Sequence, residues 1–546
     1  MTRESPVSDR GIEPTQPRSR LVTAVVAWAV IVVPAVISVL ALSPPAPVPA
    51  DAPASDFSAE RAMAHVRQIA RQPHPMGSPQ LAAVREYLEA QLRSAGLDPQ
   101  IQEAVTRHGG GRGWPGRGNT VRNIVARLPG TEGGPAVLLV SHYDSAPGAP
   151  GAADDGACVA AMLETLRALR AGPPLRRDVI FLFTDGEEAG LLGARAFVEE
   201  HPWAREAGVV LNFENRGNRG PVVMFETSDE NGWLVRRFAR VVQRPIASSL
   251  TDTVYRRMPN DTDFSVFRRA GFQGLNFACI DGVEHYHAPT DTPDNLDPRT
   301  LQHHGASMLA LARRLASDDA DPRRQPNGIY FDLLGRVLVI YPERWAIPLT
   351  AAAVLAYVGV VAAGLRSRAL TPLGMVAGLG VFLLTIAGGV LVTMLMAKIA
   401  SGPLRGTWLR AAFLAATLAT GAAAYAATGG RIRLRNQAAG ALLGWLAGAI
   451  VVACWLPGAS YLTLWPLLFG TAGLAVLTAI GRREPSSPGV LAVVLLAAAP
   501  GVLLFVPLSW LMYIALGPRQ AFVVSAMLAF LLGSMTPALR LACGRR

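Results

Sequence analysis

The sequence predicts an α/β domain, in which a mostly parallel mixed sheet is flanked by helices, joined to an all-α multispan transmembrane region. Short runs rich in Val, Ile, Leu and Phe recur through a polar middle section, and helical patterns fall between several of them, as is typical of a covered parallel sheet. Long uncharged apolar runs lie near the N-terminus and throughout the C-terminal third, as is typical of membrane spans.

The amino-acid composition supports the division into an α/β part and a membrane part, and it argues against nucleic-acid binding. Charged residues make up 17% of the 546 residues and hydrophobic residues 51%, whereas soluble domains average about 25% charged residues. The net charge of +11 does not indicate nucleic-acid binding, because the basic residues cluster in short loops between apolar runs. We therefore expect a lipid bilayer as a partner and no nucleic acid. The four cysteines form no CxxC pair and are expected to be buried single thiols.

The N-terminal segment predicts a membrane anchor. Residues 1–20 are polar and arginine-rich, which predicts a cytoplasmic tail. Residues 21–43 carry no charge and are long enough to span a bilayer. A cleaved signal peptide is the alternative, because small residues such as Ala50 follow, but the run is longer than the apolar segment of a typical signal peptide. Residues 44–55 are rich in Pro and Ala and predict a linker.

The predicted α/β domain covers residues 56–318. Strands are expected over 123–128, 136–144, 178–185, 209–215, 221–227 and 275–281. Helices are expected over 80–96, 157–171, 190–200 and 299–316. Because strands and helices alternate along much of this segment, neighbouring strands are expected to run parallel and to be covered on both faces.

A connector over 319–345, with an amphipathic stretch at 327–342, leads into a transmembrane domain over 346–546. About seven helices are expected there. Their ranges are 346–365, 372–396, 408–428, 437–456, 460–480, 489–516 and 520–541. The runs contain almost no ionisable side chain, which disfavours a transporter or a proton pump.

The charges of the loops predict an orientation for these helices. With the N-terminus in the cytoplasm, the loops 366–368, 430–435 and 481–488 all fall on the cytoplasmic side, and all are arginine-rich. This alternation agrees with the positive-inside rule. The sequence therefore predicts a multi-pass membrane protein with its α/β domain on the extracytoplasmic side, which would be periplasmic, extracellular or lumenal.

One pair of polar residues ends the predicted strand 136–144, and a second pair follows it. His142 and Asp144 are two positions apart on a strand and so point the same way, and such a carboxylate can fix the tautomer of a metal-bound histidine. An exposed strand end is the alternative. Asp154 and Asp155 stand where a glycine-rich loop enters a helix. One aspartate suffices for a helix N-cap, and the second could bridge two cations.

Further acids and histidines follow the later strands. Glu187 and Glu188 are adjacent, and crowding of like charges raises at least one pKa unless a cation compensates. The alternative is that they complement the dipole of a first helical turn. Glu214 ends another apolar strand, and His285 and His287 lie in a turn-rich loop. Each of these could simply be exposed.

Considered together, these residues predict a metal site. Ligands in an open α/β sheet bind beyond the carboxyl ends of the strands, where all of these side chains are expected. Five or more oxygen and nitrogen ligands meeting there would form a two-metal site. Histidine with carboxylate suits zinc best, and manganese or cobalt could substitute.

The same residues carry a resemblance to a known family. The motifs HYD (142–144), ADDG (153–156), DGEE (185–188), NFEN (212–215) and YHAPTDT (286–292) resemble, in order and spacing, peptidase family M28, the class of di-zinc aminopeptidases. Segment 74–80 and the helix after it also resemble the entry segment of that family. The segments 260–271 and 330–344 and the multispan tail are similar to its membrane-anchored group, which comprises the endoplasmic reticulum metallopeptidases and vacuolar membrane proteases. The implied fold is that of the zinc aminopeptidases, which is phosphorylase/hydrolase-like.

The resemblance implies two zinc ions per chain and a ligand set for them. His142 and Glu214 would bind one zinc, Glu188 and His287 would bind the other, and Asp154 would bridge the two. Many soluble members of the family carry Asp at the position of Glu214, whereas the membrane-anchored group tends to carry Glu.

The resemblance also implies catalytic roles. Glu187 would be the general base, Asp144 the partner of His142, and Tyr286 a stabiliser of the oxyanion. The implied function is that of a membrane-bound zinc metallopeptidase acting on a peptide substrate, an exopeptidase of the aminopeptidase type. The family core also serves carboxypeptidases and glutaminyl cyclases. A catalytically inactive scaffold or receptor is the alternative, and nothing in the sequence indicates an oligomeric state.

Overall fold

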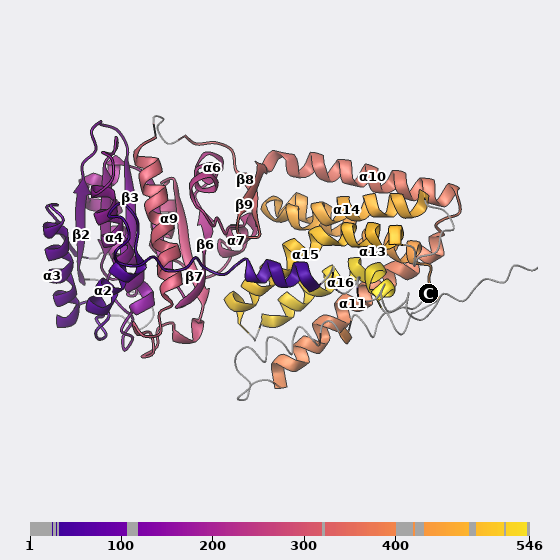
Figure 1. Ribbon diagram of the computed structural model, residues 1–546, viewed down its shortest axis with the longest axis horizontal. Helices are drawn as coiled ribbons and strands as arrows, with labels where there is room; N and C mark the ends of the chain where they lie inside the picture. The colour runs from indigo at the N-terminus through magenta and orange to yellow at the C-terminus, as the bar shows by residue number, and fades with distance from the viewer. Residues whose placement is uncertain are drawn as a thin grey trace, which may run out of the picture.

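The chain folds into an α/β part and a helical part, which lie end to end (Figure 1). The computed structural model describes residues 32–105, 118–318, 323–399, 431–479, 488–517 and 520–542, with a few single positions between them. The predicted tail 1–20, nearly all of the predicted helix 408–428 and the loop 481–487 lie outside the described residues.

The α/β part is built on a seven-stranded sheet of order β1-β2-β4-β3-β5-β7-β6. The strands are β1 Gln100–Val105, β2 Thr120–Leu128, β3 Ala136–His142, β4 Val179–Thr184, β5 Ala207–Asn215, β6 Arg219–Thr227 and β7 Gly274–Asp281. The four central strands run parallel to one another, whereas β1, β2 and β6 pair antiparallel. Every residue of β3 and β4 is buried, as expected for apolar strands covered on both faces. The mixed α/β sheet is confirmed.

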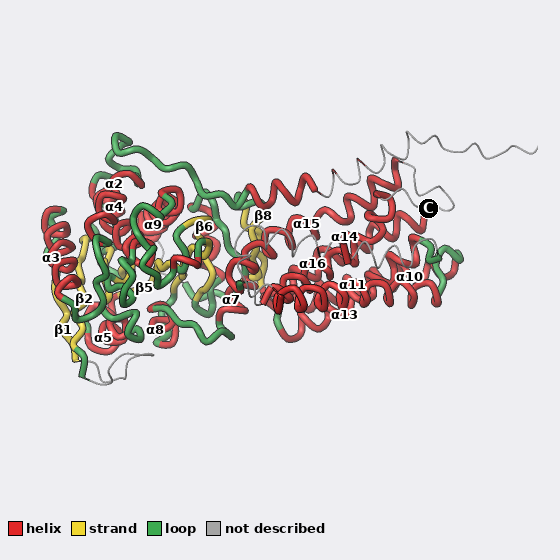
Figure 2. Tube along the Cα trace, turned by 90° about the horizontal axis from the view of Figure 1, so that it is seen from below, coloured by secondary structure: helices red, strands yellow, loops and turns green. Residues whose placement is uncertain are grey.

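Helices cover both faces of this sheet. They are α2 Ala59–Ile69, α3 Pro79–Ser94, α4 Cys158–Arg170, α5 Leu192–Glu200, α6 Gly232–Val241, α7 Ser249–Tyr255, α8 Asp263–Arg269 and α9 Pro298–Ala316. Figure 2 shows α2, α4 and α9 on one side of the strands and α5 and α8 on the other, and the buried side chains divide into two clusters in the same way. Because helices cover both faces of the sheet, we expect a functional site at the ends of the strands.

The predicted elements occur with ends shifted by a few residues, and several elements were not foreseen. Strand β1 was missed because it is an edge strand whose side chains are mostly exposed, so it lacks the apolar run that marks a central strand. Helices α7 and α8 have seven residues each, which is too short for a helical period to show. Helices α2 and α6 were also not predicted.

The amphipathic stretch 327–342 is a β-hairpin that joins the two parts. Its strands are β8 Gly328–Leu333 and β9 Val337–Pro342, connected by the three residues 334–336, of which Leu334 and Gly335 have positive φ, as tight hairpin turns often require. Side chains alternate along a strand, and the two faces of β8 have different partners. Tyr330 packs into the α/β core, whereas Ile329 and Phe331 pack against the helical part.

The helical part contains α10 Ala346–Arg366, α11 Pro372–Ile399, α13 Leu434–Trp455, α14 Ser460–Ala479, α15 Pro488–Leu516 and α16 Ala521–Ala542. Among the described residues, the first five of these are long and apolar enough to cross a membrane, and α16 carries a shorter apolar stretch, Phe522–Leu532. A further helix covers 32–40, within the predicted anchor. The five long helices fit a multi-pass membrane protein.

Contacts at the junction hold the two parts together. Ser248 Oγ lies 2.6 Å from Tyr461 OH, and Ser249 Oγ donates a hydrogen bond of 2.6 Å to the carbonyl of Gly458. The predicted linker is also attached, because the N–H of Val48 donates to Gln302 Oε1 at 3.0 Å. The α/β part is thereby placed directly against the helical part.

Glycines let α11 and α13 approach closely, as small residues do in membrane helices. A Cβ at Gly440 would overlap the backbone carbonyl of Met375 and the backbone nitrogen of Leu379. We expect Gly440→Ala to lower the free energy of unfolding by about 1–3 kcal/mol, the usual effect of overpacking, seen as a lower thermal midpoint in detergent. Gly380→Ala is the matched control, because a Cβ there meets nothing within 4 Å. Equal midpoints for the two variants would contradict the close packing.

Candidate metal centre

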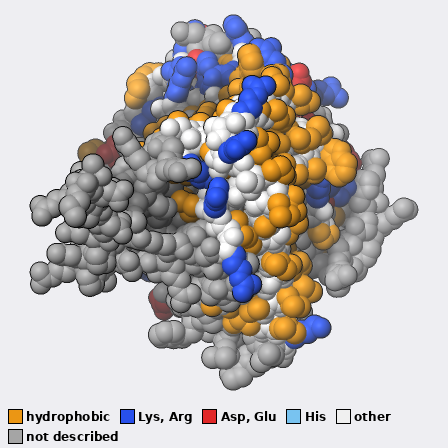
Figure 3. Space-filling model, turned by 90° about the vertical axis from the view of Figure 1, so that its right-hand side faces the viewer, with side chains coloured by type: hydrophobic (Ala, Val, Ile, Leu, Met, Phe, Trp, Pro, Cys, Tyr) orange, Lys and Arg blue, Asp and Glu red, His pale blue; other side chains and the backbone are white. Residues whose placement is uncertain are grey.

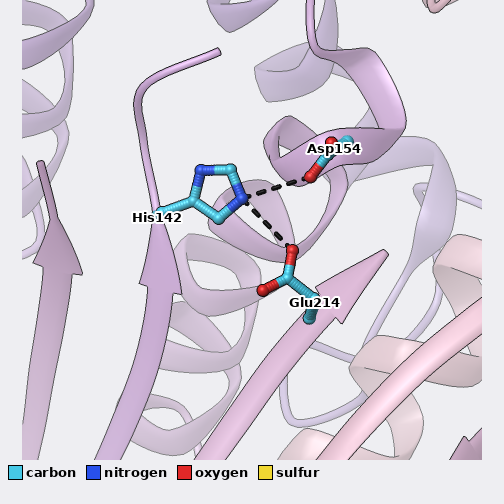
Figure 4. A group of neighbouring side chains, drawn as sticks. All are labelled: His142, Asp154 and Glu214. Carbon is cyan, nitrogen blue, oxygen red and sulfur yellow. Dashed lines mark hydrogen bonds and ion pairs between the residues drawn. The ribbon is translucent and has the colours of Figure 1, made fainter. Parts of the chain in front are cut away.

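One cluster of potential ligands gathers at the carboxyl ends of β3 and β5. His142 ends β3, Glu214 lies near the end of β5, and Asp154 comes from the turn Ala152–Ala157 that precedes α4. His142 Nε2 lies 3.2 Å from Asp154 Oδ1 and 3.2 Å from Glu214 Oε1 (Figure 4). All three residues are buried. Because β3 and β5 are neighbouring parallel strands, the fold brings together residues that are far apart in the sequence.

A second cluster shares Asp154 with the first. His287 Nε2 lies 3.2 Å from Asp154 Oδ2 and 3.0 Å from Glu188 Oε2. The two carboxylate oxygens of Asp154 therefore face different clusters, Oδ1 toward His142 and Oδ2 toward His287. His287 has a φ of 53°, a left-handed conformation that turns its ring toward Asp154 and Glu188. This is the arrangement that a carboxylate bridging two cations would take.

The tautomer of His142 follows from its hydrogen bonds. Nδ1 lies 2.9 Å from the backbone carbonyl of Asp144, which can only accept, so Nδ1 carries the hydrogen. Nε2 then faces the carboxylates of Asp154 and Glu214. Burial lowers the pKa of His142, but the charge of Glu214 and the hydrogen bonds to Asp144, Asp154 and Glu214 raise it well above its usual value. The surrounding negative charge therefore favours a cation at Nε2 of His142, either a proton or a metal ion.

Asp144 contacts the glutamate pair more directly than it contacts His142. Its two carboxylate oxygens accept hydrogen bonds from the backbone N–H groups of Glu187 at 3.1 Å and Glu188 at 3.3 Å. The distance from its carboxylate to His142 Nδ1 is 3.5 Å, and it is the carbonyl that receives the closer contact. Asp144 therefore positions the turn that carries Glu187 and Glu188, a contact that the spacing of the motif alone did not indicate.

The carboxylates of the site crowd one another. Burial and the negative charge of Glu214 raise the pKa of Glu187 well above its usual value, and burial with the charge of Asp154 raises the pKa of Glu188 to about 7. Within the described part of the chain, the buried Oε1 of Glu188 accepts no hydrogen bond, and Oδ2 of Asp154 has only its 3.2 Å contact with His287 Nε2. Unsatisfied buried acceptors are costly, so the donor set fits divalent cations, which would neutralise this charge.

Two further aspartates support the site and were not singled out from the sequence. Asp291 accepts hydrogen bonds from the backbone N–H groups of Ala153 at 2.8 Å and Asp154 at 3.2 Å, so it holds the turn that carries Asp154. Asp263 accepts a hydrogen bond of 2.5 Å from Thr184 Oγ1 at the end of β4, and burial raises its pKa to about 7. The sequence signal for these aspartates was that Asp291 lies in the motif segment 286–292 and Asp263 lies in the segment 260–271.

Tyr286 lies beside the second cluster. Its ring stacks on the ring of His287, with centroids 3.8 Å apart, and it lines the same cavity as Glu187 and Glu214. The neighbouring His285 makes a different contact, since its Nδ1 lies 3.0 Å from Thr290 Oγ1. The structure thus brings together every residue that the sequence proposed for the site and leaves His285 outside it.

A mixed α/β sheet with two histidine–carboxylate clusters at the carboxyl ends of its parallel strands defines the class of this protein, an α/β protein with a candidate metal centre. Residues 123–312 match Peptidase family M28, a range that spans β3 to α9 and holds all the clustered residues. Over this segment the chain is therefore similar to the M28 peptidases.

Two curated proteins are similar in sequence to this part of the chain. The chain is 34% identical over 235 residues to endoplasmic reticulum metallopeptidase 1 of Mus musculus, which covers 41% of this chain and 26% of that protein. It is 34% identical over 259 residues to the vacuolar membrane protease of Candida albicans (strain WO-1), which covers 47% of this chain and 30% of that protein. The matched segment thus spans between a quarter and a third of the length of these relatives.

Solved structures resemble the α/β part. An aminopeptidase from Aneurinibacillus sp. strain AM-1 superimposes with a TM-score of 0.39 and 14% identity, covering 50% of this chain and 98% of that one.

Proposed function

We propose that this chain is a membrane-bound metallopeptidase that hydrolyses peptide bonds with two zinc ions, as an exopeptidase of the aminopeptidase type. The observation that carries the proposal is Asp154, whose two carboxylate oxygens each join a separate histidine–carboxylate cluster. A single carboxylate placed between two such clusters is the arrangement of a two-metal hydrolytic site. The M28 domain and the metallopeptidase relatives support the same reading.

The donor set suits zinc. Each cluster offers one imidazole nitrogen together with carboxylate oxygens, a mixture that zinc prefers, whereas calcium and magnesium prefer oxygen alone. His142 and Glu214 would hold one ion, Glu188 and His287 the other, and Asp154 both. Bound zinc would supply polarisation of the scissile carbonyl and a water molecule of lowered pKa.

The chain's own residues would perform the remaining steps. Glu187 lines the cavity beside Glu214, and Asp144 holds its backbone in place. We assign to the Glu187 carboxylate the role of general base, which accepts a proton from water and returns it to the leaving amine. Tyr286 lines the same cavity, and its hydroxyl would donate a hydrogen bond to the developing oxyanion.

The orientation of the domain belongs to the same proposal. Helix α10 begins beside the hairpin and runs away from the α/β part (Figure 1), so Arg366 and Arg368 lie at the distant end, where both are exposed. Figure 3 views the molecule from that side and shows Lys and Arg side chains among hydrophobic ones. By the positive-inside rule, that end would face the cytoplasm. The peptidase domain, proposed to cover 56–318, would then be extracytoplasmic.

Metal analysis of the full chain purified in detergent tests the proposal. We expect about two zinc ions per chain, together with peptide hydrolysis that a chelator abolishes and added zinc restores. His287→Ala should lower the zinc content and the activity, because it removes a ligand of one cluster. His285→Ala is the matched control, a histidine of the same loop outside the clusters. A chain that binds no zinc would exclude this function and favour an inactive scaffold.

A further inference from the structure

A cavity leads from the candidate metal centre toward the helical part. Its volume is about 310 Å³, and its lining includes Glu187, Glu214 and Tyr286. The same lining includes four residues of α15, namely Leu508, Leu511, Met512 and Ala515. The cavity therefore connects the proposed reacting groups with a helix that is long and apolar enough to cross a membrane.

The residues of α15 present one continuous apolar face to the cavity. Their spacing of three, four and seven positions places them on one side of a helix. Leu508, Leu511 and Met512 are buried, although they belong to the last two turns of a membrane-spanning helix. Leu511 packs with Val223 and Ile246 of the α/β part, and α15 packs against β7, whereas Leu508 and Met512 belong to the core of the helical part.

The α/β part supplies an apolar wall as well. The cavity is lined by Val223 and Phe225 of β6 and by Ile280 of β7. The ring of Phe225 packs edge to face on the ring of Tyr255, with the two ring centroids 4.7 Å apart. Asp261 also belongs to the lining, but Arg269 pairs with it at 2.7 Å. Apart from the catalytic end, the cavity thus presents mainly carbon and sulfur atoms.

We propose that α15 forms part of the substrate site and selects peptides that carry a large apolar side chain next to the scissile bond. This inference rests on the proposed peptidase function. Burial of such a side chain against Leu511 and Met512 is favourable in proportion to the apolar area removed from water, whereas a charged side chain placed against these two residues would lose hydration that they cannot replace. The membrane region is then a determinant of specificity, and the α/β domain alone would have an incomplete cavity.

The test measures kcat/KM of the full chain in detergent for leucyl and alanyl p-nitroanilides. We expect the wild type to prefer the leucyl substrate. Leu511→Ala removes apolar contacts, and Ala515→Phe fills the cavity. Each change should lower the leucyl-to-alanyl ratio by about tenfold, since a few methylene groups in an apolar pocket discriminate to this degree. Leu496→Ala is the matched control, because Leu496 lies on the same helix and is 71% exposed.

The outcomes distinguish failure of the inference about α15 from failure of the proposed peptidase function. Hydrolysis of neither substrate by the wild type would overturn the proposed function, and the inference with it. Hydrolysis with a ratio that Leu511→Ala and Ala515→Phe leave unchanged would overturn only the inference, as would an equal change in Leu496→Ala. Continued hydrolysis of the alanyl substrate by the α15 variants would show that they are folded, so that a lowered ratio supports the inference.

Discussion

Replacing Glu187 with glutamine is expected to lower kcat by about 10²–10⁴-fold, the usual contribution of a general base, while the zinc content stays near that of the wild type. Glutamine keeps the size of the side chain and leaves the backbone N–H free to donate to Asp144 as before. It cannot accept a proton from water. The measurement is steady-state peptide hydrolysis together with metal analysis of the same sample.

The control for this variant is Glu200→Gln, an exposed glutamate at the end of α5, which should keep full activity. Normal turnover in Glu187→Gln would show that another group takes the proton. Loss of zinc from Glu187→Gln would show instead that this carboxylate is a ligand, and the roles of the two adjacent glutamates would then have to be exchanged.

Replacing Asp154 with asparagine is expected to remove both metals and to abolish activity. Asp154 is the only described residue shared by the two clusters, and the neutral amide offers one oxygen where the carboxylate offers two. Glu214→Gln affects only the cluster that contains His142, so it should lower the zinc content by about one ion per chain. The measurement is zinc content after dialysis, supported by the thermal midpoint with and without added zinc.

Asp98→Asn, a change at an exposed aspartate, is the control and should retain the zinc content of the wild type. If Asp154→Asn kept both ions, the clusters would not share a ligand, and the two-metal proposal would be wrong. Zinc bound to the folded site would stabilise the folded state, so the wild type should gain thermal stability on zinc addition, and Asp154→Asn should gain little.

Much of the fold could be predicted from local patterns in the sequence. The apolar runs at β3 and β4 predicted buried strands because a residue covered on both faces must be apolar. Sequence patterns did not predict the edge strand β1, because most of its side chains are exposed. They did not predict α8 either, because seven residues are too few to show a helical period. The hairpin at 327–342 was recognised as amphipathic, but its two faces proved to contact two different parts of the molecule.

The candidate site was predictable for a different reason. His142, Glu188 and Glu214 each lie at or just beyond the carboxyl end of a strand, and the carboxyl ends of parallel strands meet at one edge of a sheet. The contact between the Asp144 carboxylate and the backbone of the glutamate turn was not predictable in this way. Backbone donors carry no signature in the sequence, so only the folded chain shows which acceptor they reach.

By itself, the sequence determined the apolar strands and helices, the positions of the acids and histidines at strand ends, and the division into two parts. These features depend on the nature of each residue and its neighbours along the chain. Only the tertiary structure decided that Asp154 stands between His142 and His287, and that α15 closes the cavity beside them. Such contacts depend on the order of strands in the sheet and on how two parts dock, which local periodicity does not encode.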